Sequence, residues 1–197
     1  MTIFSFIRKI GISLAAVISL SIAVPATAQA PGENMRFFSM NGRIDVIDGT
    51  RGEYHGKIKW VRYGEEQDIL MMAPTGKTLA MLTQKNGGFE LMTSEGHFLQ
   101  SGSSEELLQK ALGYQFPLNG LDYWVQGAAS PLSAFQSKPN AQGQFDSISQ
   151  DGWDIRYGQY FKPEGDVTSK VPRQITAVRG DLSIKVSVDN WVARNNQ

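Results

Sequence analysis

The chain has 197 residues with 19 basic and 19 acidic side chains, so its formal net charge at pH 7 is zero. Nucleic-acid affinity depends on clustered Lys and Arg that neutralise phosphates, so this balance argues against a nucleic-acid-binding protein and against a strongly basic membrane-binding surface. The sequence contains no cysteine, which excludes a disulfide framework and thiolate chemistry. Packing alone must therefore hold the fold together.

The N-terminal residues have the features of a secretory signal peptide. Two basic residues precede an apolar, uncharged run over residues 10–24, and this run is shorter than the roughly 20 residues that a membrane-spanning helix needs. We expect cleavage after Ala28, because Pro31 would hinder a peptidase acting after Ala30. The sequence therefore predicts a signal peptide over residues 1–28, a short segment over residues 29–35 and one domain over residues 36–197.

The first half of this domain is predicted to be a series of strands. Apolar and polar residues alternate from Phe38 to Val46, which is typical of a strand with one buried face. Asp48-Gly49 predicts a turn, and a second alternating strand runs to Trp60. Four shorter strands are then expected in the stretches DILMMAP, KTLAMLTQ, FELMTS and HFLQS.

The pattern changes to helical spacing in the middle of the chain. Ser103 followed by Glu105 and Glu106 predicts a helix start, and Gly113 can end the helix. The stretch PLNGLDYWVQG predicts a second short helix closed by Gly127. Five further strands are expected around SAFQSK, QFDSISQ, WDIRYGQYF, RQITAVRG and LSIKVSVDNW.

The order of these elements predicts a mainly β fold. An antiparallel sheet of about eleven strands curls rather than staying flat. Two helices inserted midway have one natural place, over the concave face of such a sheet. We therefore predict a curved antiparallel sheet that forms a cup with a helical lid.

The sequence offers no convincing catalytic or metal-binding group of residues. The stretch MMAPTGKT resembles the end of a phosphate-binding loop, but Met71 replaces the first glycine and a strand pattern follows instead of a helix. His55 and His97 lie on different predicted strands, whereas a zinc site needs three or four ligands. Solvated strand positions explain both histidines better, and we predict no metal and no cofactor.

Asp151 and Asp154, on either side of Trp153, could be imagined as an acid–base pair. However, Asp151-Gly152 is a turn signal, and strand alternation places Asp154 on the face opposite Trp153. We therefore predict that the protein is not an enzyme.

The remaining signal is a set of methionine, tryptophan and aliphatic residues on the predicted inner face and the lid. Each of them is explained singly as core, but a one-layer sheet with two short helices can leave a cavity that accepts flexible acyl chains. A register error of one residue would move the whole apolar set of a strand to the other face. The predicted lining residues are Met40, Ile44, Ile58, Trp60, Met71, Met81, Leu108, Leu121, Trp124, Trp153 and Ile184, of which Leu108, Leu121 and Trp124 belong to the lid.

Several stretches carry a family resemblance. They are FSMNGRIDV, KIKWVRYGEEQDILMMAPTGKTLAML, PLNGLDYWVQG, SQDGWDIRYGQY and PRQITAVRGDLSIKVSVDNW. In this order and spacing the domain resembles the LolB family of outer-membrane lipoprotein receptors. The pattern P-L-x-x-L-x-x-W-x-x-G and the final Asp189-Asn190-Trp191 are the most specific parts of the resemblance.

The resemblance implies an unclosed antiparallel barrel with a helical lid and an apolar cavity, and no catalysis. It implies a receptor that accepts the acyl chains of lipoproteins from the periplasmic carrier LolA and delivers them to the inner leaflet of the outer membrane. We expect such a protein to act as a monomer.

Two features depart from the family. Typical members carry a lipidated cysteine just after the signal, but the segment from Ala28 to Pro31 contains none. We therefore expect a periplasmic protein, at most peripheral to the outer membrane and not lipid-anchored. Family members also carry a protruding leucine between a proline and a glycine, whereas this chain has Pro74, Thr75 and Gly76. This loop is the candidate membrane-facing tip, with less apolar area for insertion.

Two other functions fit the same pattern. One is a soluble periplasmic carrier of lipoproteins or other acylated ligands that has no membrane-anchored receptor role. The other is a structural module that binds no lipid, and co-purified lipid would distinguish the two. Arg43, Lys57 and Arg62 are candidate contacts for an acidic partner, although solvated strand faces explain them equally well.

Overall fold

The computed structural model describes residues 37–50, 52–113, 115–162, 164 and 170–194. Within them, eleven strands form one antiparallel sheet in the order β6-β5-β4-β3-β2-β1-β11-β10-β9-β8-β7. The strands are β1 (Phe37–Asp48), β2 (Gly52–Tyr63), β3 (Glu66–Met72), β4 (Thr78–Lys85), β5 (Gly88–Thr93), β6 (Phe98–Ser101), β7 (Phe135–Pro139), β8 (Phe145–Gln150), β9 (Trp153–Tyr157), β10 (Gln174–Arg179) and β11 (Leu182–Arg194).

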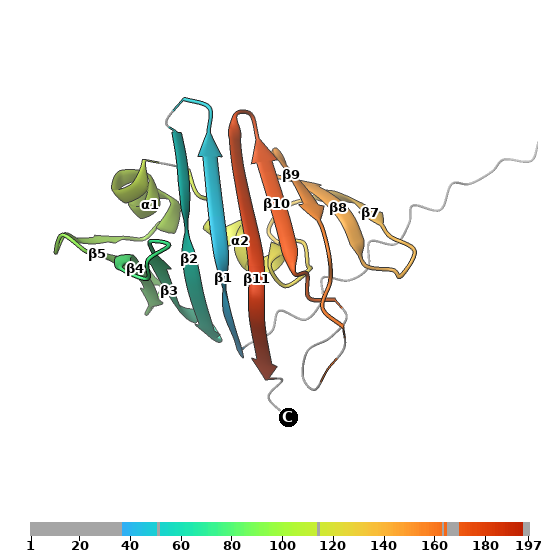
Figure 1. Ribbon diagram of the computed structural model, residues 1–197, viewed down its shortest axis with the longest axis horizontal. Coiled ribbons are helices and arrows are strands. Elements are labelled where there is room, and N and C mark those ends of the chain that lie inside the picture. The colour runs from blue at the N-terminus through green and yellow to red at the C-terminus, as the bar shows by residue number, and fades with distance from the viewer. Residues whose placement is uncertain (1–36, 51, 114, 163, 165–169, 195–197) are drawn as a thin grey trace, which may run out of the picture.

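The sheet curves without closing, because β6 and β7 are its two edges. Figure 1 shows the outer face, with the long strands β1, β2 and β11 at the centre and the shorter strands bending away on both sides. The predicted order of six strands, two helices and five strands is confirmed. Residues 1–36, which include the predicted signal peptide, lie outside the described residues.

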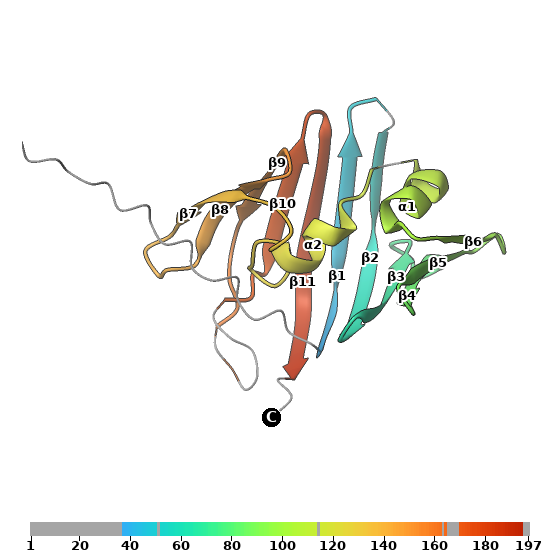
Figure 2. The same ribbon diagram turned by 180° about the vertical axis from the view of Figure 1, so that it is seen from behind.

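The two helices, which we call the lid, cover the concave face (Figure 2). Helix α1 (Ser104–Leu112) begins at the predicted cap, where the Ser103 hydroxyl accepts a hydrogen bond from the Glu106 backbone N–H, and it ends at Gly113 in the left-handed conformation. Helix α2 (Leu118–Trp124) follows Pro117 and buries its apolar face. Both helices contribute to the same core as the sheet.

The pairing of β1 with β11 depends on Gly42. A register shift occurs between Asn41 and Gly42, and such a bulge bends the strand that carries it. A Cβ atom at Gly42 would collide with the backbone carbonyl oxygen of Ser187, so only glycine allows the two backbones to approach this closely. The bulge thus contributes to the curvature at the centre of the sheet.

Candidate functional site

The concave face gathers nearly all the predicted lining residues. Ten of the eleven are buried, and they lie in one continuous apolar cluster that joins the sheet to the lid. These ten are Met40, Ile44, Ile58, Trp60, Met71, Leu108, Leu121, Trp124, Trp153 and Ile184. Sequence reasoning therefore brought together residues that are far apart in the chain and adjacent in the fold.

Met81 is the exception, and its predicted position was wrong. Its side chain is 40% exposed on the outer face, while Ala80 and Leu82 take the buried positions on either side of it. Successive side chains of a strand alternate between the two faces, so the prediction for β4 was out of register by one residue. The neighbouring strand agrees, because the partner of Met81 on β5 is Met92, which is also exposed.

Hydrogen bonds fix the indole rings that line the concave face. The Trp124 Nε1–H on α2 donates to the Gln150 Oε1 of β8 at 3.0 Å, and the Gln150 amide also bonds to the backbone of Ser130. The Trp60 Nε1–H donates to the Gln67 Oε1 at 2.8 Å. Because buried polar groups cost free energy when unpaired, Gln67 and Gln150 hold these rings in defined orientations.

An ion pair between Arg62 of β2 and Asp122 of α2 connects the lid to the sheet. The two side chains are only 13% and 8% exposed. Burial lowers the pKa of Arg62, yet a guanidinium stays charged at neutral pH. Arg62 therefore does not lie on a solvated strand face as a rim residue, and its charge is committed to the lid.

Sequence reasoning missed this pair, although one signal was present. Asp122 lies among apolar residues, directly between Leu121 and Tyr123, and a carboxylate is rarely buried without a partner. Only one of its oxygens is paired: among the described residues Asp122 Oδ1 has no hydrogen-bond partner. Arg62 thus pairs with one oxygen of Asp122, and the other oxygen is buried without a hydrogen-bond donor in the described part of the chain.

A hollow of about 580 Å³ lies beside the lid. This volume falls within the range of about 300–1,000 Å³ that is usual for small-molecule sites. The guanidinium of Arg179 lies over the Trp153 ring at 4.5 Å, and Glu105, Glu106 and Asp151 supply carboxylates. Apolar side chains in its wall are Phe116, Pro117, Trp124, Leu132 and Trp153. The hollow therefore combines apolar walls with charged groups.

Two buried polar atoms inside the cup have no hydrogen-bond partner among the described residues. They are the Tyr157 hydroxyl and the Trp191 Nε1–H. Burial raises the pKa of Tyr157 well above its ordinary value, so the phenol stays protonated and can donate. Each atom can therefore donate a hydrogen bond to a water or to a carbonyl group that enters the cup.

The stretch that resembles a phosphate-binding loop and the carboxylate of Asp154 lie where the sequence predicted, at a turn and on the outer face of a strand. Gly76 lies in the turn between β3 and β4, where the Ala73 N–H donates to the Lys77 carbonyl at 2.8 Å. Asp154 is exposed and accepts a hydrogen bond from Ser149 at 2.8 Å, on the face opposite Trp153. Within the described ranges, no group of three or more His, Cys, Asp or Glu side chains could hold a metal ion.

The comparisons with known proteins agree with this architecture. A sequence model of the family described as "Outer membrane lipoprotein LolB" matches residues 36–191. The chain belongs to the LolB family. This is a family of lipoprotein-localisation receptors and not a known family of enzymes.

Individual relatives extend over most of the chain. The outer-membrane lipoprotein LolB of Nitrosomonas europaea is 28% identical over 154 residues, covering 78% of this chain and 72% of that protein. The protein of the same name from Azoarcus sp. is 30% identical over 154 residues, covering 78% and 77%. That of Marinobacter nauticus is 32% identical over 133 residues, covering 67% and 64%.

A solved structure supports the fold. The crystal structure of a LolA superfamily protein from Nitrosomonas europaea superposes with a TM-score of 0.52 at 9% sequence identity, covering 83% of this chain and 88% of that chain. This likeness concerns the fold alone and confirms the predicted unclosed sheet with two helices. None of the helices in the described parts of this LolB-family chain is both long and apolar enough to cross a membrane.

The loop that departs from the LolB pattern is an exposed tip. Pro74, Thr75 and Gly76 are all exposed in the turn between β3 and β4. The turn is closed by the Gly76 N–H, which donates to the Ala73 carbonyl at 2.8 Å. The tip thus presents a hydroxyl-bearing side chain to solvent where the family resemblance implies a leucine.

Proposed function

We propose that this chain is a lipoprotein acceptor that takes acylated lipoproteins from a LolA-type carrier and promotes their localisation to the outer membrane. The observation that carries the proposal is the match to the LolB family over residues 36–191, on a fold whose concave apolar face is covered by two helices. The protein acts as a monomer and without catalysis.

Acyl chains occupy the cup between the concave face and the lid. The ten buried lining residues already pack against one another, so chains can enter only where side chains and lid move apart. The hollow beside Trp124 and Trp153 is the opening, since it adjoins both lid and sheet. The Tyr157 hydroxyl and the Trp191 Nε1–H are the donors available to the ester or amide carbonyls of the cargo.

Differences in affinity set the direction of transfer. A receptor can take cargo from a carrier only if it holds the chains better, and it can release them only to a bilayer that holds them better still. Burial of a methylene group contributes about 0.8 kcal/mol. A difference of a few buried methylenes between carrier, receptor and bilayer therefore suffices to direct the cargo.

The protein performs this function in the periplasm after cleavage of the signal peptide, and it touches the outer membrane from the periplasmic side. None of its 197 residues is a cysteine that could carry a lipid anchor. Contact with the inner leaflet is thus transient and peripheral, through the tip formed by Pro74, Thr75 and Gly76.

The experiment is transfer of a triacylated lipoprotein from a loaded LolA-type carrier to the protein purified from the periplasm. We expect the cargo to move to this protein in the absence of vesicles. Leu132→Glu places a charge at the proposed opening and should slow transfer, because Leu132 lines the hollow and is 79% exposed. Val192→Glu is the matched control, since Val192 is 41% exposed on the opposite face.

The other outcomes identify the alternative functions. If cargo stays on the carrier while native mass spectrometry finds co-purified acyl lipid, the protein is a carrier of other acylated ligands. If neither cargo nor lipid binds, it is a structural module. Either result would overturn the proposed acceptor function.

A further inference from the structure

Three large apolar side chains are exposed next to one another on the outer face, at one end of the sheet. Met81 of β4 pairs with Met92 of β5, and Met92 pairs with Phe98 of β6. Their side chains are 40%, 57% and 52% exposed. Leu70 of β3, the partner of Met81 on the other side, continues the row and is half-buried. Residues directly opposite on neighbouring strands have Cβ atoms about 5 Å apart, so the four side chains form one apolar band.

A polar row runs parallel to this apolar band. The Thr83 hydroxyl of β4 donates to Asp68 of β3 at 2.7 Å, and the Gln100 amide of β6 donates to Glu90 of β5 at 2.8 Å. These residues stand two positions along each strand from the apolar ones, which corresponds to roughly 7 Å. The apolar band lies on the side of the β3–β4 and β5–β6 turns, and the acidic row lies on the far side.

Lysines flank the apolar band. Lys59 of β2 is the partner of Leu70, and Lys57 stands two residues earlier on the same strand and face. Lys77 is exposed in the β3–β4 turn. None of these three lysines takes part in an ion pair found among the described residues. Their charges are therefore free to meet an anionic surface.

Among the described residues, three carboxylates lie on the turn side of the band. Asp45 of β1 and Glu53 of β2 both bond to the ring of His55, beyond Lys57 on the same face. Glu95, in the β5–β6 turn, has an oxygen 3.7 Å from the Nδ1 of His97. Asp45 and Glu53 are bonded to His55, whereas Lys59 is directly opposite Leu70 of the band and Lys57 lies between Lys59 and His55. Together the turns, the apolar band and the lysines form one end that is apolar and basic, whereas the neighbouring row is acidic.

We propose that the outer face of β3–β6 binds the surface of an anionic lipid bilayer. The binding surface, which we call the Met-Phe patch, consists of Leu70, Met81, Met92 and Phe98 flanked by Lys57, Lys59 and Lys77. Apolar side chains enter the boundary between headgroups and acyl chains, lysines meet anionic headgroups, and the acidic row stays in water. This inference adds to the proposed acceptor function a membrane contact that does not depend on residue 75.

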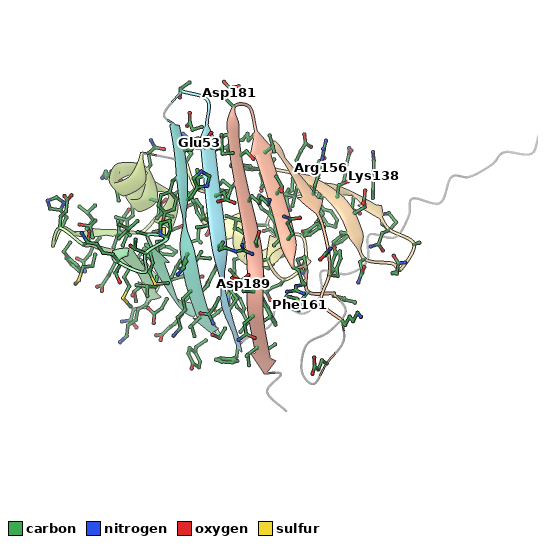
Figure 3. All side chains as sticks on the ribbon, viewed as in Figure 1. Glu53, Lys138, Arg156, Phe161, Asp181 and Asp189 are labelled. Atoms are coloured by element: carbon green, nitrogen blue, oxygen red, sulfur yellow. The ribbon has the colours of Figure 1, made fainter. Side chains whose placement is uncertain are left out.

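The patch lies on the face opposite the apolar cup, since the buried neighbours Ala80, Leu82 and Leu91 point inward. Charged side chains lie elsewhere on the outer face: Figure 3, viewed from this side, shows Lys138 on β7, Arg156 on β9 and Asp189 on β11. Membrane contact through the patch therefore leaves the concave face and lid free for cargo.

A bilayer fits the patch better than a second copy of this chain. In a symmetric dimer the same surface of both subunits meets around a two-fold axis. A dimer would therefore bring the lysines of both copies into one interface, whereas an anionic bilayer complements them. Charge complementarity thus favours lipid as the occupant.

The test is co-sedimentation of the protein purified from the periplasm with vesicles of equal parts phosphatidylethanolamine and phosphatidylglycerol. Met92→Gln combined with Phe98→Gln should weaken binding about tenfold or more, because the apolar contribution to binding scales with buried apolar area. The control is Ile47→Gln combined with Val178→Gln, which removes apolar side chains 42% and 38% exposed on β1 and β10. This control should bind like the unaltered protein.

A second variant tests the lysines. Lys57→Gln combined with Lys59→Gln should weaken binding to these vesicles by about tenfold at low salt, and the loss should shrink as salt is added. The same variant should change little on vesicles of phosphatidylcholine alone. Both positions are exposed, so the substitutions leave the core intact, and circular dichroism checks the fold of each variant.

Three results would overturn the inference. The unaltered protein could fail to sediment with anionic vesicles, or the Met92/Phe98 variant could bind as well as its control. Alternatively, sedimentation velocity could show a dimer that the variant dissociates without a change in vesicle binding, which would make the patch a contact between copies. Because these measurements need neither cargo nor carrier, their failure is distinguishable from failure of vesicle-free lipoprotein transfer, which tests the acceptor function.

Discussion

The ion pair between Arg62 and Asp122 offers the sharpest test of how the lid is held. Arg62→Met leaves the Asp122 carboxylate, 8% exposed and with Oδ1 already unpartnered, without its counter-charge. Breaking a buried pair by removing one partner costs about 3–5 kcal/mol. For a domain of this size, this loss corresponds to a fall in Tm of roughly 6–20 °C.

Substitution of the other partner, Asp122, should lower the free energy of unfolding by a smaller amount. After Asp122→Asn, the Arg62 guanidinium keeps the hydrogen bond from its Nε–H to the Gly64 carbonyl at 2.8 Å, and the amide can still accept a hydrogen bond. We expect a loss of about 2 kcal/mol. Arg62→Met combined with Asp122→Leu should return the free energy of unfolding to within about 1 kcal/mol of the original, because apolar pairs often replace buried ion pairs without loss.

Urea unfolding followed by tryptophan fluorescence measures these differences, since Trp60 and Trp124 are fully buried. The control is Arg43→Met, which breaks an ion pair with Asp189 whose side chains are 63% and 55% exposed. Exposed pairs contribute at most about 1 kcal/mol, so this variant should change little. If Arg62→Met were no more destabilising than Arg43→Met, the lid would not depend on the buried pair.

Three further predictions concern the register of β4, the lid and the outer face of the sheet. Met81→Lys should change the free energy of unfolding by less than about 0.5 kcal/mol, whereas Leu82→Lys should prevent folding. Equal effects of the two substitutions in thermal unfolding would contradict the register of β4. Trp124→Phe removes the indole donor to Gln150 and should lower the free energy of unfolding by about 1–2 kcal/mol, measured by urea unfolding. An unchanged free energy of unfolding would show that this hydrogen bond does not stabilise the fold. Hydrogen bonds with Asp45 at 2.7 Å and Glu53 at 3.2 Å raise the pKa of His55, so its contribution to stability is complete below its unfolded-state pKa of about 6.5 and is lost as pH rises through the folded-state pKa. An NMR titration should therefore place the His55 pKa above that of a free histidine, and His55→Asn should flatten the fall in stability over this pH range; an unshifted pKa would refute the contact.

Local sequence patterns determined much of the fold. Alternation placed Met40, Ile44 and Ile58 on the buried face, because one face of each central strand meets the lid and the other meets water. The Ser103 cap and Gly113 stop predicted helix α1, since both act through the backbone of the neighbouring turn. These signals are local, so a single sequence contains them.

The errors arose where distant parts of the chain decide the outcome. In β4 the run Leu79-Ala80-Met81-Leu82 is apolar throughout, and only pairing with β3 and β5 decides that Met81 faces outward. An arginine on a strand is ordinarily expected to face solvent. Arg62 is instead largely buried, because α2 places the Asp122 carboxylate beside it. The Met-Phe patch could not be predicted for the same reason, because its four apolar residues come from four strands that become neighbours only in the sheet.

The central claim is acceptance of lipoprotein cargo, and transfer from a loaded LolA-type carrier in solution tests it most directly. The protein and the carrier would be mixed without vesicles, separated, and assayed for the triacylated lipoprotein. We expect most of the cargo to move to this protein, and we expect Leu132→Glu to slow the movement while Val192→Glu does not. Cargo that remains on the carrier, with the protein folded, would contradict it.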